Sequence, residues 1–277
     1  MPQTINTNIA SLNAQRNLNT SQASLATSMQ RLSSGLRVNS AKDDAAGLAI
    51  AERMNAQVRG MNVAIRNSND AISLAQTAEG AIGKVGDMLQ RMRELAVQSA
   101  NGTNGTSDQL SLDQEFQELA KEITRTLTTT KFNGLAILGA DAGTKGFQVG
   151  ANSDEVISVT TTKLTSDAAV LSVTDATSAI STTASASAAI SNIDTALNKI
   201  NSERATYGAA QNRFEAVISN LQVAAENQAA ARSRIMDADF AAETANLSRA
   251  QILQQAGTAM VAQANALPQQ VLQLLRS

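Results

Sequence analysis

The sequence predicts a mainly α-helical protein, with long antiparallel coiled-coil helices and a small β-hairpin region in the middle of the chain. Three observations indicate this fold. Aromatic residues make up only 2% of the 277 residues, so the interior has to be built from Ala, Leu, Ile, Val and Met. Proline occurs only at Pro2 and Pro268, so nothing between them forbids very long helices. Apolar residues also recur at helical spacing over most of the chain.

The N-terminal segment carries an apolar stripe at three- and four-residue spacing that extends from Ile5 to Leu36. Gly35 breaks this pattern, and a second helix begins within SSGLRVNSAKDDAAG. Asp43 or Asp44 is suited to cap that helix, because a carboxylate accepts hydrogen bonds from the first free backbone N–H groups.

The second helix keeps the same spacing to about Ser99. The stretch NGTNGTSD at 101–108 is rich in turn-forming residues and predicts a loop. A further helix follows, because apolar residues return at helical spacing from Leu112 to Leu127. The N-terminal half is therefore predicted to be almost entirely helical.

The middle of the chain has a different pattern. KFNGLAILG at 131–139 contains an Asn-Gly turn signal. Residues 146–150 and 155–162 read as two short strands joined by ANSD, which predicts a β-hairpin near 146–162. The segment 177–191 consists almost wholly of Ser, Thr and Ala, and we expect a loop that passes into the next helix.

The C-terminal half carries two heptad ladders. The first includes Ile193, Ile200, Tyr207 and Phe214, and the second consists of Leu253, Met260, Leu267 and Leu274, joined by Ala256, Ala264 and Val271. No Gly or Pro lies within 209–256, so this stretch would span about 70 Å if it formed one continuous helix. A chain that goes out along one helical arm and returns along the other brings its ends together. We therefore expect the second ladder to pack against the N-terminal stripe.

The two ends of the chain are almost free of charge. Arg16 is the sole charged side chain between Met1 and Gln30, and Arg276 is the sole one between Ala250 and Ser277. Uncharged polar faces suit helices that are enclosed by other helices. Ordering the chain costs roughly 1–2 kcal/mol of free energy per residue. Two helices that pack only against each other leave about half of each surface exposed to water, so burial of their apolar side chains does not offset this cost. We therefore expect both ends to be disordered in the monomer and helical in an assembly.

Composition excludes several function classes. The chain has no Cys and no His, which removes thiolate and imidazole chemistry and nearly every zinc site, so we expect no cofactor, no metal and no enzyme. The formal charge of −2 gives no basic field for nucleic acid. No apolar run is long enough for a membrane span, and the first residues lack the pattern of a cleaved signal peptide. A secreted membrane-active helical protein is an alternative of another class, but the polar faces of the ends lack the Lys and Arg it needs.

Four stretches resemble the terminal motifs of bacterial flagellin: INTNIASLNAQRNL at 5–18, RLSSGLRVNSAKDDAAGLAIAERM at 31–54, QRMRELAVQSANGTN at 90–104, and residues 233–276. The resemblance implies a structural subunit that polymerises with many copies of itself into an extracellular filament, the propeller of a swimming bacterium. It also implies export, unfolded and uncleaved, through the flagellar type III channel. The nearest structural alternative is a hook–filament junction protein.

The resemblance also implies a domain layout. Residues 1–44 and 236–277 would form an inner filament-core domain, disordered in the monomer. Residues 45–235 would form a rod-like outer-tube domain, with the β-hairpin near 146–162 and the Ser/Thr/Ala-rich segment 177–191. Larger flagellins carry bulky outward domains between the two halves, and this chain has none, which implies a thin or absent outer layer.

Two sets of residues are assigned by the resemblance. A surface read by the animal Toll-like receptor for flagellin, which also packs between subunits, would contain Gln90, Arg91, Leu95 and Glu115. A C-terminal stripe would pack in the filament core, be sheltered beforehand by an export chaperone and be sensed by cytosolic immune receptors; it contains Leu253, Met260, Leu267, Val271, Leu272, Leu274 and Leu275. Filament cap and hook-junction proteins are further implied partners. Pro268 is expected to kink or divide the C-terminal helix.

Overall fold

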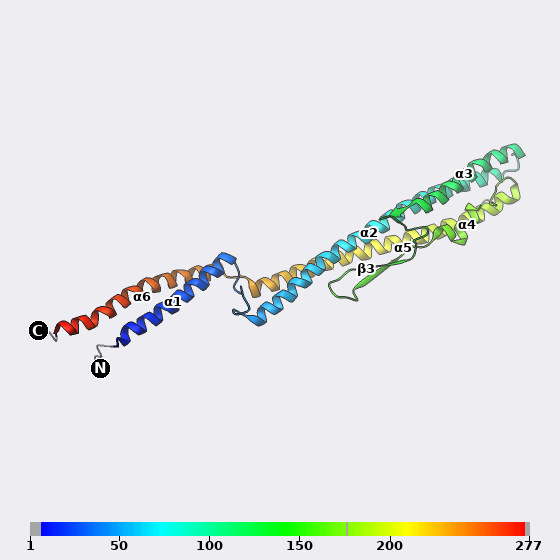
Figure 1. The fold of residues 1–277 in the computed structure, drawn as a ribbon. Coiled ribbons are helices and arrows are strands. Elements are labelled where there is room, and N and C mark those ends of the chain that lie inside the picture. The colour runs from blue at the N-terminus through cyan, green and yellow to red at the C-terminus, as the bar shows by residue number, and fades with distance from the viewer. Residues whose placement is uncertain (1–6, 176, 275–277) are drawn as a thin grey trace. The chain divides into compact units, whose positions relative to one another are not determined.

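The computed structural model describes residues 7–175 and 177–274, with side-chain burial described through residue 266. The helices are α1 (Ile9–Ser34), α2 (Ala45–Ser99), α3 (Thr106–Thr129), α4 (Ala168–Thr174), α5 (Thr183–Met236) and α6 (Phe240–Leu274), shown in Figure 1. A short 3-10 helix spans Leu164–Ser166, and the strands are β1 (Lys131–Phe132), β2 (Leu135–Ala136), β3 (Thr144–Gln148) and β4 (Val156–Thr160). The prediction of long helices around a small β region is confirmed.

The chain divides into two compact units. Unit 1 contains Met1–Ala56 and Asn227–Ser277, and unit 2 contains Gln57–Glu226. The divisions fall inside α2 and α5, because each of these helices has one end in each unit.

The first two helices begin and end where local chemistry requires it. Gly35 adopts a left-handed backbone (φ 71°), and its N–H donates to the carbonyl of Arg31 over 2.9 Å, which ends α1. Asp44 caps the start of α2, because its Oδ1 accepts from the N–H of Gly47 over 2.8 Å. Asp43 instead accepts from the backbone of Asn39 and Ser40 and fixes the connecting loop. The Ser40 hydroxyl also donates to Asp43, over 3.0 Å. This bond has the largest effect in lowering the pKa of Asp43, and the two backbone bonds add to it.

The stretch 209–256, which lacks Gly and Pro, is not one continuous helix. α5 ends at Met236, and Asp239 starts α6 by accepting from the N–H groups of Ala241 and Ala242 over 2.9 and 3.2 Å. A side-chain cap can therefore restart a helix without any Gly or Pro. The break is held by the N-terminal loop, since the N–H of Ala238 donates to the carbonyl of Gly35 over 3.0 Å. α6 then continues through Pro268 to Leu274, so the helix is not divided there.

Unit 2 contains a continuous apolar core between α2, α3 and α5. Tyr207, Phe116 and Phe214 are its largest fully buried side chains. The first heptad ladder is confirmed, because Ile193, Ile200, Tyr207 and Phe214 all lie in this core. The edge of one ring meets the face of the other in the Phe147–Phe214 pair, whose centroids are 5.9 Å apart, and this contact fastens the hairpin to α5.

Two hairpins form the β region. The Asn133-Gly134 pair turns between β1 and β2 with φ values of 49° and 81°, as its turn signal predicts. β3 and β4 pair antiparallel, from Thr144 opposite Thr160 to Gln148 opposite Val156, so the predicted strand boundaries were off by one to two residues. The helix α4 was not predicted, since seven residues show too little periodicity.

Candidate assembly and recognition surfaces

The contact between α1 and α6, here called the seam, is built from small and polar side chains. The two helices run antiparallel and side by side (Figure 1). Within α1 the buried residues are Ser11 and Ser28. Within residues 240–266 of α6 they are Glu243, Ala250 and Ala264. No large apolar side chain in these described parts is buried in the seam.

Small residues let the two backbones approach closely. A Cβ placed on Gly257 would lie 3.1 Å from Cδ1 of Leu18, so Leu18 packs directly onto the backbone of α6. Residues of α6 that are at least half-buried recur at heptad positions Glu243, Leu247, Ala250, Gln254, Gly257, Val261 and Ala264. This second set of heptad positions, and not the Leu/Met ladder, faces α1.

The Leu/Met ladder of α6 is exposed where its side chains are described. Leu253 is 50% and Met260 is 62% exposed, and neighbouring Ile252 is 65% exposed. We call these three residues the outer ladder. The expectation that the ladder packs against the N-terminal stripe is therefore wrong for Leu253 and Met260, because the other set of heptad positions on α6 faces α1. The predicted stripe residues Leu267, Val271, Leu272 and Leu274 lie beyond the described side chains, and Leu275 lies outside the described residues.

α1 also exposes large apolar side chains. Ile9, Leu12 and Met29 are more than half exposed, and so is Phe240 at the start of α6. Large apolar side chains are thus exposed on both helices of the pair. Within the seam the fully buried side chains are small or polar, whereas the larger Leu18, Leu25, Leu32, Leu247 and Val261 are only half-buried.

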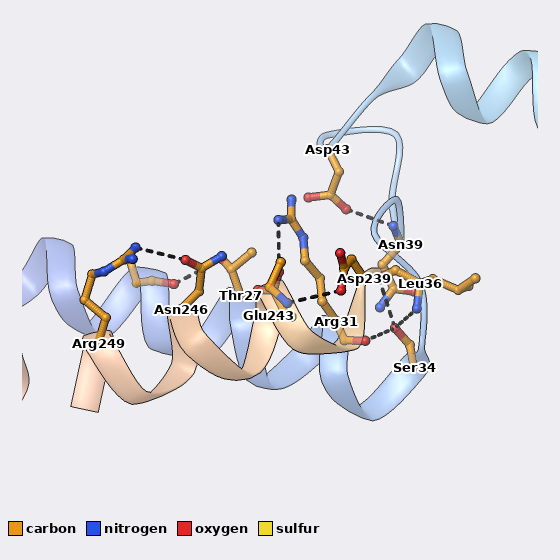
Figure 2. Close-up of polar contacts among 12 residues, drawn as sticks. Thr27, Arg31, Ser34, Leu36, Asn39, Asp43, Asp239, Glu243, Asn246 and Arg249 are labelled. Carbon is orange, nitrogen blue, oxygen red and sulfur yellow. Dashed lines mark hydrogen bonds and ion pairs between the residues drawn. The ribbon is translucent and has the colours of Figure 1, made fainter. Parts of the chain in front are cut away.

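Polar bonds give the seam its register. The Asn8 side-chain amide donates to the carbonyl of Ala264 over 2.7 Å, and the Ser11 hydroxyl donates to Oδ1 of Asn265 over 2.7 Å. Further along, Arg31 of α1 reaches toward Glu243 of α6 at 4.0 Å (Figure 2). Glu243 is only 8% exposed, so this carboxylate depends on the guanidinium beside it.

A shallow open groove lies along the same stretch of the two helices. Its walls carry Arg31, Glu243, Asn246 and Arg249 together with several Ser and Thr residues of α1. Within the groove, Arg249 donates to Oδ1 of Asn246 over 3.0 Å (Figure 2). The lining also includes Ala23, Ala250 and the exposed Leu253, so it mixes polar and apolar side chains.

The predicted recognition residues Arg91 and Glu115 are brought together by the packing of α2 on α3. Nε of Arg91 donates to Oε1 of Glu115 over 2.9 Å, and a second guanidinium nitrogen donates to Glu94 over 2.9 Å. The hydrogen bonds to Glu94 and then Glu115 raise the pKa of Arg91. Arg91 and Glu115 are both about half exposed, and Gln90 is exposed beside them.

Leu95 lies elsewhere. Its side chain is 1% exposed and belongs to the core of unit 2, where it supports the surface from below. Its spacing with Leu89 and Met92 could have shown this, since all three fall on one helix face. Sequence reasoning missed two neighbours on the exposed face. Val97 is 49% exposed, and Nε of Arg93 donates to Oδ1 of Asp194 over 2.7 Å, which joins α2 to α5.

Residues 7–175 and 177–274 contain no group of three or more acidic side chains placed to hold a metal ion. None of their helices has a stretch that is both long and apolar enough for a membrane crossing.

These features define a coiled-coil structural protein whose terminal helix pair leaves its large apolar side chains uncovered. Two family descriptions match the sequence: "Bacterial flagellin N-terminal helical region" over residues 5–144 and "Bacterial flagellin C-terminal helical region" over residues 190–275. The chain belongs to the bacterial flagellin family. It is a structural subunit of the extracellular flagellar filament, the class of protein that the terminal motifs predict.

Similar proteins agree with this assignment over nearly the whole chain. A flagellin of Halalkalibacterium halodurans is 50% identical over 272 residues, which cover 98% of this chain and 99% of that protein. A flagellin of Xenorhabdus nematophila is 43% identical, with complete coverage of both chains. The crystal structure of Bacillus cereus flagellin matches with a TM-score of 0.51 and 36% identity, covering 60% of this chain and 94% of that one.

A putative flagellar hook-associated protein from Vibrio parahaemolyticus shares the fold alone, with a TM-score of 0.54 and 14% identity over 70% of this chain and all of that one. Sequence identity therefore favours flagellin over the hook–filament junction alternative.

Proposed function

We propose that copies of this chain polymerise by covering each other's outer ladder and the exposed apolar face of α1. The observation that carries this proposal is the exposure of Ile252, Leu253 and Met260 on a helix whose contact with α1 is already made by a different set of heptad positions. A large apolar side chain contributes roughly 1.5–3 kcal/mol when it becomes fully buried. In the filament, contacts between copies bury these side chains without undoing the seam.

In this proposal the chain has two domains, one that buries its apolar side chains when the single chain folds and one that buries them when copies assemble. Residues 1–44 and 236–277 form the filament core and become ordered only when neighbouring copies surround them. Residues 45–235 form the outer tube. The support for this division is the contrast between a seam with little apolar burial and the continuous core of unit 2.

The test is polymerisation of the purified full chain, followed by electron microscopy and sedimentation. The variant Ile252→Ser/Leu253→Ser is expected to stay monomeric at concentrations at which the unchanged chain forms filaments. The variant Gln255→Ser/Gln263→Ser is the matched control, since both glutamines are exposed on the same helix. Normal filaments from Ile252→Ser/Leu253→Ser would refute the proposed interface.

We also propose that the surface formed by Gln90, Arg91 and Glu115 over Leu95 is read by the Toll-like receptor for flagellin and is covered in the filament. Its support is the exposed Arg91–Glu115 ion pair on the joined face of α2 and α3. Arg91→Asp is expected to reduce receptor signalling by monomers at least tenfold. Arg125→Asp is the control, because Arg125 forms a comparable exposed pair with Glu122 on α3. An unchanged response to Arg91→Asp would refute this assignment.

The remaining partners concern the C-terminal stripe, Leu253 to Leu275. We propose that an export chaperone shelters this stripe before the chain leaves, unfolded and uncleaved, through the type III channel, and that cytosolic immune receptors sense its last leucines. Filament cap and hook-junction proteins complete the set of partners. Pull-down of the chaperone by the full chain, compared with a chain truncated before residue 267, tests the first of these contacts.

A further inference from the structure

The methionines of this protein fall into two groups. Met29 on α1 is 57% exposed and Met260 on α6 is 62% exposed. Met61, Met92 and Met236 are buried, and Met54 and Met88 are half-buried. The two exposed methionines of the described residues are therefore both on the terminal helix pair.

Both exposed methionines extend apolar surfaces outside the seam. Met260 lies two turns beyond Leu253 on the same face of α6, because seven residues separate them. Met29 lies one turn from Leu25 and from Leu32, both half-buried at the edge of the seam. Neither thioether is a buried part of unit 1, so a change in its polarity leaves the helix pair intact.

The thioether side chains of Met29 and Met260 are sensitive to oxidation. Hydrogen peroxide transfers one oxygen atom to the thioether sulfur, which loses two electrons, and the other peroxide oxygen leaves as water. The product is a sulfoxide, a polar group with a strong hydrogen-bond acceptor. Burial of that acceptor without a donor is unfavourable, whereas burial of the thioether is favourable.

We propose that Met29 and Met260 are modification sites at which a peroxide oxidant blocks addition of the subunit to a growing filament. This inference rests on the proposed function, because the two side chains have to become buried between copies for the oxidation to matter. The sulfoxide is solvated and harmless in the free chain. In the assembled polymer it would be enclosed, so oxidised chains stay in solution while unmodified chains assemble.

The proposal also predicts that assembly protects the two methionines from oxidation. Once a filament has formed, neighbouring copies shield Met29 and Met260 from peroxide. Oxidation then acts on newly arriving subunits and spares finished filament. Because methionine sulfoxide is reducible by dedicated reductases, the block is reversible.

The experiment compares full-length chains with and without limited hydrogen peroxide treatment. Peptide mass spectrometry locates the sulfoxides, circular dichroism confirms that the helices remain, and sedimentation gives the concentration above which filaments form. Treated wild-type chains are expected to need at least a tenfold higher concentration. Met29→Leu/Met260→Leu keeps the apolar surface and is expected to polymerise equally with and without peroxide.

Two further variants sharpen the result. Met54→Leu/Met88→Leu retains both proposed sites and is expected to respond to peroxide like the wild type. Met29→Gln/Met260→Gln places a polar group at both sites without oxidation and is expected to polymerise poorly. Peroxide added to finished filaments is expected to oxidise Met29 and Met260 at least tenfold more slowly than in free chains.

Three results would overturn the inference. Equal polymerisation of oxidised and untreated wild-type chains would do so, as would loss of polymerisation by peroxide-treated Met29→Leu/Met260→Leu, or equal oxidation rates in filament and free chain. In the first two cases untreated chains still polymerise through the outer ladder, so the proposed function survives. Equal oxidation rates would also count against burial of Met260 in the proposed interface. A chain that polymerises under no condition would overturn the proposed function and this inference together.

Discussion

Unit 1 and unit 2 are both built from long helices, but they bury different residues. The core of unit 2 encloses Phe116, Tyr207 and Phe214 together with a long series of Leu, Ile and Val side chains. The seam of unit 1 fully buries only small or polar side chains, and fully buried larger apolar side chains of unit 1 belong to a separate cluster that contains Val38 and Met236. Unit 2 therefore has an extended apolar core of its own, whereas the seam of unit 1 leaves Ile252, Leu253 and Met260 exposed. In the proposed function, the same heptad spacing serves intramolecular folding in unit 2 and intermolecular assembly in unit 1.

The largest expected effect is loss of a core aromatic ring in unit 2. Phe116→Ala should lower the free energy of unfolding by about 3–5 kcal/mol, because the removed ring leaves a cavity among fully buried neighbours. Urea unfolding of the monomer, followed by circular dichroism, measures this change. In unit 1, Ile252→Ala should change the same free energy by less than about 0.5 kcal/mol, since Ile252 is exposed. Comparable losses in both variants would break the comparison between the units.

A smaller effect is expected from overpacking the seam. Gly257→Ile should cost about 1–3 kcal/mol of local stability, because the new Cβ would lie 3.1 Å from Leu18 and the larger side chain would push Leu18 aside. In filaments, where α1 and α6 are proposed to be ordered, amide hydrogen exchange in α1 should accelerate accordingly. The control is Gly80→Ala in α2, where nothing lies within 4 Å of an added Cβ. That variant should be stabilised by up to about 1 kcal/mol through helix propensity. Unchanged exchange in α1 of Gly257→Ile would contradict the close approach of the helices.

The core of unit 2 also predicts a dependence on alkaline pH. The pKa of Tyr207 is raised from 10.0 to about 12, mainly because the side chain is buried and to a smaller extent because of the negative charge of Glu203. The folded state therefore keeps a proton that the unfolded state loses. The stabilisation is complete below pH 10 and declines as the pH rises toward 12, by roughly 1–2 kcal/mol after allowance for partial screening.

The measurement is direct, because Tyr207 is the single tyrosine of the chain. Titration of its phenolate absorbance should give a midpoint well above 10 in the folded protein. Tyr207→Phe should show a smaller loss of stability between pH 10 and pH 12 than the unchanged chain. A phenolate midpoint near 10 in the folded protein would rule out burial as the controlling influence.

The smallest expected effect concerns the surface of unit 2. The Arg93–Asp194 ion pair joins α2 to α5, and both side chains are nearly half exposed. A double-mutant cycle with Arg93→Ala and Asp194→Ala should give a coupling free energy of about 0.2–1 kcal/mol that falls with added salt. A coupling above 2 kcal/mol would mean that this pair, and not the apolar core, holds the two helices together.

Much of the local structure could be predicted from the sequence. Asp44 and Gly35 mark helix boundaries through hydrogen bonds within a few residues, and Asn133-Gly134 marks a hairpin through its own backbone preference. The restart at Asp239 was missed because a run without Gly or Pro offered no visible break. For the recognition surface, Arg91 and Glu115 were predicted together, but the burial of Leu95 depends on which face of α2 meets the core.

The sequence by itself determined the long helices, the hairpins and the flagellin family, since these follow from periodicity, caps, turns and motifs that are local in the chain. Only the tertiary structure decided which of two heptad ladders on α6 faces α1. Both ladders have the right period, so spacing could not choose between them. The set that faces α1 contains Ala250, Gly257 and Ala264, and at Gly257 the side chain of Leu18 contacts the backbone of α6. Such contacts join residues that are far apart in the chain, and they leave Leu253 and Met260 exposed, where we propose that other copies of the chain bind.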